Sequence, residues 1–178
     1  LPKTPKPHRC EKLIMFKKDK AQVVTNRLLP GIHCFAWNAD CSKVAVCPMN
    51  NEIWVFATGG QADITKWERQ CVMKEHFSII SALDWHPTTN LLLSASTDRA
   101  VIVWEEGKNA QGDTFVPMMG ITPEKKACTD STWNAEGNKF CVGSSSGYVY
   151  VGTYEPKQNF WVANPLKKKP IHSASVTA

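Results

Sequence analysis

Short apolar stretches of strand length, separated by turn residues, recur along the chain. Three of them end in a tryptophan, at Trp37, Trp85 and Trp133, and these tryptophans stand 48 residues apart. No helical period of apolar residues is sustained for ten residues, so the pattern favours β-strands. Self-similarity at a fixed interval of about 40 to 50 residues is typical of a β-propeller, whose blades each contain four strands. The sequence therefore predicts an all-β propeller.

Each repeat predicts four strands joined by turns, and the repeats begin after a leader. We expect a leader over residues 1–26, partly extended or disordered, and the N-terminal half of a propeller over residues 27–178. A linker from Pro165 to Pro170 leads to the first strand of a fourth blade, from Ile171 onward. The chain thus predicts about three blades and the start of a fourth. The predicted strands are 32–37, 43–47, 52–56 and 67–72 in the first blade, 79–85, 91–96, 100–104 and 115–119 in the second, and 127–133, 139–143, 148–151 and 160–163 in the third.

The second repeat carries four polar side chains, His76, Ser94, Asp98 and Trp104. Serine, histidine and aspartate are the ingredients of a nucleophilic site, but no Gly-x-Ser-x-Gly elbow surrounds the serine, whose neighbours are apolar. A closed hydrogen-bond chain that satisfies buried polar groups is the favoured interpretation. The first and third repeats lack the complete set. We therefore expect this tetrad to be structural and not catalytic.

The net charge of +5 is unevenly distributed, because residues 1–27 hold eight Lys or Arg against two acidic residues. A basic arm can bind nucleic acid through counterion release. Aromatic residues are almost absent from this segment, so a solvated leader is favoured and no nucleic acid is expected. No apolar run is long enough to cross a bilayer and no secretory signal is recognisable, so the prediction is a cytoplasmic protein without membrane insertion.

Motifs for cofactors, metals and enzymatic chemistry are missing from the sequence. No Cys-x-x-Cys pair, metal-spaced histidines or glycine-rich phosphate loop occurs, so we expect no cofactor, no metal and no enzyme activity. One candidate partner contact remains, Trp161 with Lys167, Lys168 and Lys169. Three lysines beside an aromatic residue could seat an acidic partner peptide, although a solvated loop is the more common role of such a run.

Several stretches resemble one family of WD-repeat proteins. The similarity covers about residues 27–178, and the stretches that carry it are 34–40, 44–48, 50–53, 74–76, 83–87, 138–144, 160–161 and 167–171. These stretches are similar to the WD-repeat subunit, subunit 1, of the actin-related protein 2/3 complex. The resemblance implies a seven-bladed propeller and a non-catalytic scaffold that supports nucleation of branched actin filaments. Its implied partners are the other subunits and, through the complex, actin and nucleation-promoting factors, in the cytoplasmic actin cytoskeleton.

Two features depart from this family. The basic leader is longer than the family's short start, and everything after the opening of the fourth blade is missing, including the late insertion through which the family is thought to touch actin. Three blades cannot close a ring, so we expect a fragment stabilised by a partner, by self-association or by a non-native closure. The alternative function is a WD-repeat adaptor of an RNA or chromatin assembly that uses the leader.

Overall fold

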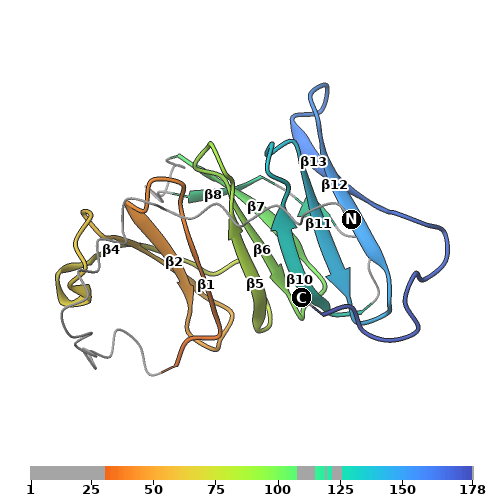
Figure 1. Cartoon of the computed structure of the whole chain (residues 1–178), viewed down its shortest axis with the longest axis horizontal. Helices are drawn as coiled ribbons and strands as arrows, with labels where there is room; N and C mark the ends of the chain where they lie inside the picture. The colour runs from red at the N-terminus through yellow and green to blue at the C-terminus, as the bar shows by residue number, and fades with distance from the viewer. Residues whose placement is uncertain (1–30, 108–114, 119, 122–125, 178) are drawn as a thin grey trace, which may run out of the picture.

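Three mainly antiparallel β-sheets stand side by side in the computed structural model, which describes residues 31–107, 115–118, 120–121 and 126–177 (Figure 1). Apart from strands, these residues contain one 3-10 turn, η1 (Ile64–Lys66). The all-β prediction is confirmed, and the arrangement is that of a partial propeller. The leader, residues 1–26, lies outside the described residues, so the domain boundary stays a prediction.

Blades one and two are four-stranded sheets in which each strand pairs with the next along the chain. Short turns join the first three strands of each blade, a longer connection leads to the fourth, and all consecutive strands form antiparallel pairs. The strands are β1 (Cys34–Trp37), β2 (Lys43–Cys47), β3 (Ile53–Ala57) and β4 (Glu68–Met73) in blade one, and β5 (Ile80–Trp85), β6 (Leu92–Ser96), β7 (Val101–Glu106) and β8 (Phe115–Met118) in blade two.

Blade three has four antiparallel strands in the same order as the other blades, and a fifth strand at its outer edge. The additional strand, β9 (Gly120–Ile121), belongs to the connection between blades two and three and pairs in parallel with the outermost strand of blade three. The sequence pattern did not predict β9, because a two-residue strand carries no periodicity. The other strands are β10 (Cys128–Trp133), β11 (Lys139–Ser144), β12 (Val149–Glu155) and β13 (Phe160–Pro165).

The three recurring tryptophans occupy the same place in their blades. Trp37 pairs with Val44, Trp85 with Leu92, and Trp133 with Phe140, so in each blade the indole ends the innermost strand opposite the start of the second. The innermost strands β1, β5 and β10 are neighbours in space. The 48-residue interval therefore does mark one structural unit repeated around a common centre.

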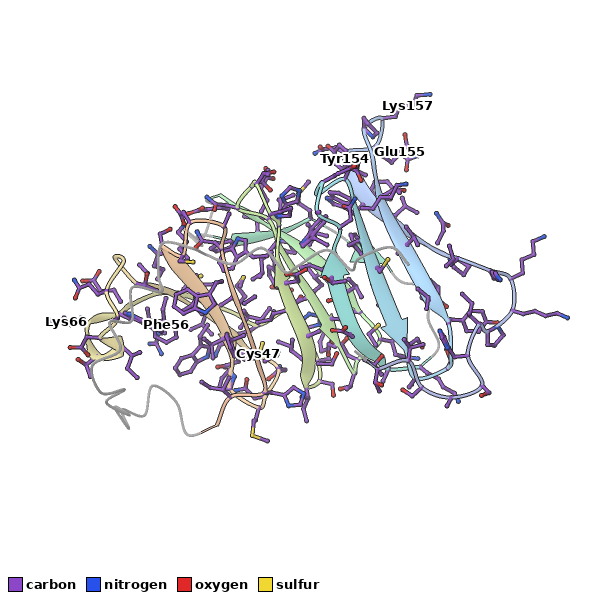
Figure 2. The ribbon with its side chains drawn as sticks, in the orientation of Figure 1. Cys47, Phe56, Lys66, Tyr154, Glu155 and Lys157 are labelled. Carbon is purple, nitrogen blue, oxygen red and sulfur yellow. The ribbon has the colours of Figure 1, made fainter. Side chains whose placement is uncertain are left out.

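Apolar side chains fill the two spaces between neighbouring blades. Along β2, Ala45 and Cys47 face blade two, whereas Val44 and Val46 point to the opposite face, as the two-residue period of a strand requires. Figure 2 shows Cys47 on the side of blade two and Phe56 on the other side. A second cluster joins Leu93, Ala95 and Val103 of blade two to Trp133 and Phe140 of blade three.

The segment after β13 differs from its prediction. A strand is expected from Ile171 onward, but residues 166–177 form bends and irregular chain without a strand. The 48-residue register explains this, because His172 is equivalent to His76, which also lies in a loop ahead of its strand. The loop is held against blade three, where Ile171 and His172 donate their backbone N–H groups to the Gly147 carbonyl.

The described part of the chain contains no helix of the length and apolarity that crossing a membrane requires.

Candidate functional site

The four tetrad residues come from four neighbouring parts of blade two. His76 lies in the loop between β4 and β5, Ser94 on β6, Asp98 in the turn between β6 and β7, and Trp104 on β7. The turn is tight, because Arg99 adopts a positive φ of 77° and donates its backbone N–H to the Ser96 carbonyl. This turn returns the chain into β7 and directs the Asp98 carboxylate toward the His76 loop.

A continuous chain of hydrogen bonds links the four side chains. The Trp104 Nε1–H donates to Ser94 Oγ at 2.8 Å, and Ser94 Oγ lies 2.8 Å from His76 Nε2. On the other side of the ring, His76 Nδ1 lies 3.0 Å from Asp98 Oδ2. An ionised carboxylate can only accept, so His76 Nδ1–H donates to Asp98, and Nε2 of the neutral ring then accepts a hydrogen bond from the Ser94 hydroxyl. The structure thus brings all four predicted residues together.

The electrostatics of the site favour a neutral histidine beside a charged aspartate. Burial lowers the pKa of His76 and outweighs the opposite effect of Asp98. Burial alone would raise the pKa of Asp98, but hydrogen bonds from the backbone N–H groups of Ala100 and Phe77, together with His76, lower it. Neutral His76 fits the direction of the hydrogen-bond chain, because its Nε2 must accept from Ser94.

Burial decides what the tetrad can do chemically. Ser94 is completely buried and His76 is 1% exposed, with blade one packed against this side of blade two. A nucleophilic serine needs room for a substrate next to its oxygen, together with oxyanion donors. Here the Ser94 oxygen already accepts the indole N–H of Trp104, and protein atoms surround it. The arrangement can satisfy buried polar groups and fix the loop, and it offers no access to a substrate.

The equivalent positions in blades one and three carry different residue types. At the places of Ser94, Asp98 and Trp104, blade one has an apolar residue, an asparagine and an aromatic residue, and blade three has an apolar residue, a serine and a glycine. Asn50 repeats part of the turn, because its Oδ1 accepts the backbone N–H of Glu52 at 2.8 Å, as Asp98 Oδ1 accepts that of Ala100. The residues at these places are Val46, Asn50 and Phe56 in blade one, and Val142, Ser146 and Gly152 in blade three.

Two polar residues that the sequence did not single out connect blade two to blade three. Asp84 Oδ2 accepts the Thr132 hydroxyl at 2.8 Å and the Trp133 backbone N–H at 2.7 Å. His86 Nε2 donates to the Gly137 carbonyl at 2.8 Å, because its Nδ1 accepts two backbone N–H groups of its own turn. Their partners lie about one repeat further along the chain, so only the stacking of the blades reveals these contacts.

The structure does not bring the candidate partner contact together. Trp161 is 5% exposed at the start of β13, where it packs against Trp133, and one edge lines a groove of about 610 Å³ between blades two and three. The lysines 167–169 follow the other end of the same strand and are exposed. The length of β13 therefore separates the indole from the lysines, and a joint contact with one short peptide has no geometric support.

Comparison with known proteins agrees with this architecture. The family model of the WD domain, G-beta repeat, matches residues 67–105, which run from the outer strand of blade one to the third strand of blade two and include the whole tetrad. The chain is 34% identical over 158 residues to actin-related protein 2/3 complex subunit 1A of Arabidopsis thaliana. It is 31% identical over 146 residues to subunit 1A-A of Xenopus laevis and 30% identical over 159 residues to subunit 1 of Saccharomyces cerevisiae.

The chain thus carries a WD repeat and is similar over most of its length to subunit 1 of the actin-related protein 2/3 complex. The matched regions cover 89%, 82% and 88% of this chain, in the order of the relatives named above, but only 37% to 39% of those relatives. The chain therefore spans less than half the length of the curated relatives that it matches. Across its described residues, no group of three or more His, Cys, Asp or Glu side chains is arranged to hold a metal ion.

Proposed function

We propose that the chain serves as a non-catalytic scaffold subunit of an actin-related protein 2/3 complex, supporting nucleation of branched actin filaments. The observation that carries this proposal is the similarity of nearly the whole chain to proteins from a plant, an animal and a yeast that all bear the name of subunit 1 of this complex. The partners in this proposal are the other subunits and, through the assembled complex, actin and nucleation-promoting factors. The place of action is the cytoplasmic actin cytoskeleton.

The geometry supports a scaffold in two ways. Stacked antiparallel sheets with apolar contacts between them form a rigid body that presents loops along both edges. The group of residues that most resembles an active site is buried and committed to hydrogen bonds within the blade. A scaffold needs this rigidity, whereas the buried serine offers nothing to a substrate.

Co-purification tests the proposal. The tagged 178-residue chain is expressed with the other subunits of the complex, and we expect it to be recovered with them in one assembly by size-exclusion chromatography. A polypeptide with the tag alone serves as the control. Recovery of the chain without any of these subunits would contradict the proposal.

The alternative function, an adaptor in RNA or chromatin assemblies, has one specific observation in its favour, the net charge of +6 within residues 1–27. Binding through phosphate contacts weakens steeply as salt concentration rises. RNA affinity is therefore measured at two salt concentrations for the whole chain and for the chain without residues 1–26. Steep salt dependence that disappears with the leader would favour the adaptor over the scaffold.

A further inference from the structure

Four large apolar side chains are exposed along one edge of blades one and two. They lie in the loops ahead of β1, between β2 and β3, and between β4 and β5. Phe77 is the extreme case, because its side chain is 93% exposed. We call these four residues the loop-edge patch: Ile32 (47% exposed), Met49 (63%), Phe77 (93%) and Ile79 (45%).

Hydrogen bonds and close packing join the loops of the patch into one surface. The Asn51 side chain donates to the His76 carbonyl at 2.8 Å, so the turn between β2 and β3 contacts the loop that carries Phe77. The backbone N–H of Ile80 donates to the Asn50 carbonyl at 3.4 Å and links the same two loops next to Ile79. Gly31 lies so close to Met49 that a Cβ built on it would come within 2.9 Å of the Met49 sulfur.

The tetrad fixes the backbone that carries the exposed phenyl ring. Asp98 Oδ2, which bonds His76, also accepts the backbone N–H of Phe77 at 2.8 Å. Two residues after Phe77, the Ile79 carbonyl accepts the Thr97 backbone N–H at 2.9 Å and the Ser96 hydroxyl at 3.0 Å. The loop is therefore fixed at both ends while its aromatic side chain points into solvent. A side chain on a fixed backbone loses less conformational entropy on binding than one on a loose loop.

We propose that the loop-edge patch is the surface by which this chain docks onto another subunit of its complex, with the Phe77 ring inserted into an apolar pocket of that subunit. The inference rests on the proposed function and deepens it. Aromatic residues at the centre of an interface commonly carry much of the binding energy, provided that a pocket desolvates them. A protruding ring needs such a concave apolar partner, and its own blade provides no cover for it.

The charges around the patch favour a protein over a lipid surface. The neighbouring loops carry both signs. Lys74, which is followed by Glu75, pairs with Glu52 at 2.7 Å, and the turn between β6 and β7 adds Asp98 and Arg99. An apolar centre with a rim of mixed charge is the usual anatomy of a protein interface. Anionic membranes instead select an excess of lysine and arginine.

Phe77→Ala in the full chain tests the proposal, with Leu166→Ala as the matched control. Leu166 is also a large apolar side chain, 58% exposed, but it lies after β13 on blade three. The affinity of each variant for the remaining subunits is measured by titration, and stability is measured by urea unfolding. We expect Phe77→Ala to weaken binding about tenfold or more without loss of stability. Leu166→Ala should change the binding affinity less than about twofold.

Four results would overturn the inference. Binding of Phe77→Ala within about twofold of the parent chain would show that the ring is not an anchor. Loss of binding to phosphatidylserine vesicles, with unchanged subunit affinity, would assign the patch to lipid. Loss of a dimer of this chain, again with unchanged subunit affinity, would assign the patch to a second copy. If the parent chain itself binds none of the subunits, the proposed function fails together with the inference.

Discussion

The carboxylate of Asp98 serves three donors at once. It accepts from His76 Nδ1 at 3.0 Å, from the Phe77 backbone N–H at 2.8 Å and, through its other oxygen, from the Ala100 backbone N–H at 2.8 Å. Removing the carboxylate leaves these donors without their partner, and one of them is fully buried. We expect Asp98→Ala to lower the free energy of unfolding by about 2 to 4 kcal/mol, measured by urea denaturation.

Asp40 provides the matched control for this substitution. Its carboxylate also organises a turn, accepting the backbone N–H of Ser42 at 3.0 Å and the hydroxyl of the same residue at 2.7 Å, but the site is exposed. Water replaces the lost bonds there, so Asp40→Ala should cost less than about 1 kcal/mol. Equal losses for the two variants would mean that the tetrad adds nothing beyond an ordinary turn.

The histidine of the tetrad makes stability depend on pH. Burial lowers the pKa of His76 below its ordinary value of 6.5, so the folded protein binds fewer protons at this ring than the unfolded chain. The stabilisation is complete above pH 6.5 and declines as pH falls from there toward the lowered pKa of the folded state. The pKa of Asp98 is also lowered, from 3.8, so its contribution disappears in a second, more acidic window.

We expect the free energy of unfolding of the parent chain to fall between pH 7.5 and pH 5.5, with a slope approaching about 1.4 kcal/mol per pH unit for one proton. His76→Gln should be less stable at pH 7.5 and should show a flatter slope over the same range. His33→Gln serves as the control, because His33 is exposed. Parallel slopes for the parent chain and His76→Gln would exclude a buried neutral histidine.

At the scale of the element, blades two and three place a bulky aromatic side chain on different strands. In blade two Leu92 on β6 pairs with Trp104 on β7, and in blade three Phe140 on β11 pairs with Gly152 on β12. A Cβ added to Gly152 would lie 2.1 Å from the Phe140 ring. The glycine is therefore required because the ring occupies the space that the indole fills in blade two.

This exchange predicts strong coupling between the two positions. Gly152→Ala should destabilise the parent chain by about 1 to 3 kcal/mol, because overpacking displaces the Phe140 ring. In a Phe140→Leu background the same substitution should cost at least about 1 kcal/mol less. The measurement is a double-mutant cycle of urea unfolding, with Gly107→Ala as the control since a Cβ at that position would meet nothing within 4 Å. Additive costs at positions 140 and 152 would contradict the proposed filling of space.

The sequence predicts the repeating elements well and the contacts between them poorly. Apolar alternation and the tryptophan interval place nearly every strand, because both are local consequences of a four-stranded sheet buried on both faces. The contacts of Asp84 and His86 depend on how two sheets stack, and no local pattern encodes that. Trp161 and the lysines 167–169 are neighbours in sequence, but an extended strand of six residues carries them to opposite ends of β13.

Over the whole molecule, the two spaces between blades differ in what fills them. Between blades one and two the tetrad lies within an apolar cluster that includes Trp85, Trp104 and Phe115. Between blades two and three, aromatic rings dominate, with the Trp133 and Trp161 ring centroids 4.9 Å apart. Asp84 and His86 add hydrogen bonds between the same two blades. Each blade thus stabilises its neighbour, so a substitution in the space between two blades should lower the stability of both sheets.

The face of blade one that points away from blade two has no covering sheet among the described residues. It carries Trp37, Trp54 and Phe56, and Phe35 on the same side of β1 is 59% exposed. In blades two and three the equivalent faces are buried against a neighbouring sheet. An exposed aromatic face of this kind favours association between molecules.

We therefore expect a polypeptide of residues 31–177 to self-associate as its concentration rises, measured by size-exclusion chromatography with light scattering. Phe35→Lys places a charge on the open face and should weaken the association about tenfold or more, because a partner face would have to bury the ammonium group. Phe77→Lys alters an exposed aromatic residue outside this face and should leave the association unchanged. A cooperatively melting monomer at every concentration would show that the open face of blade one is stable in water without a covering sheet.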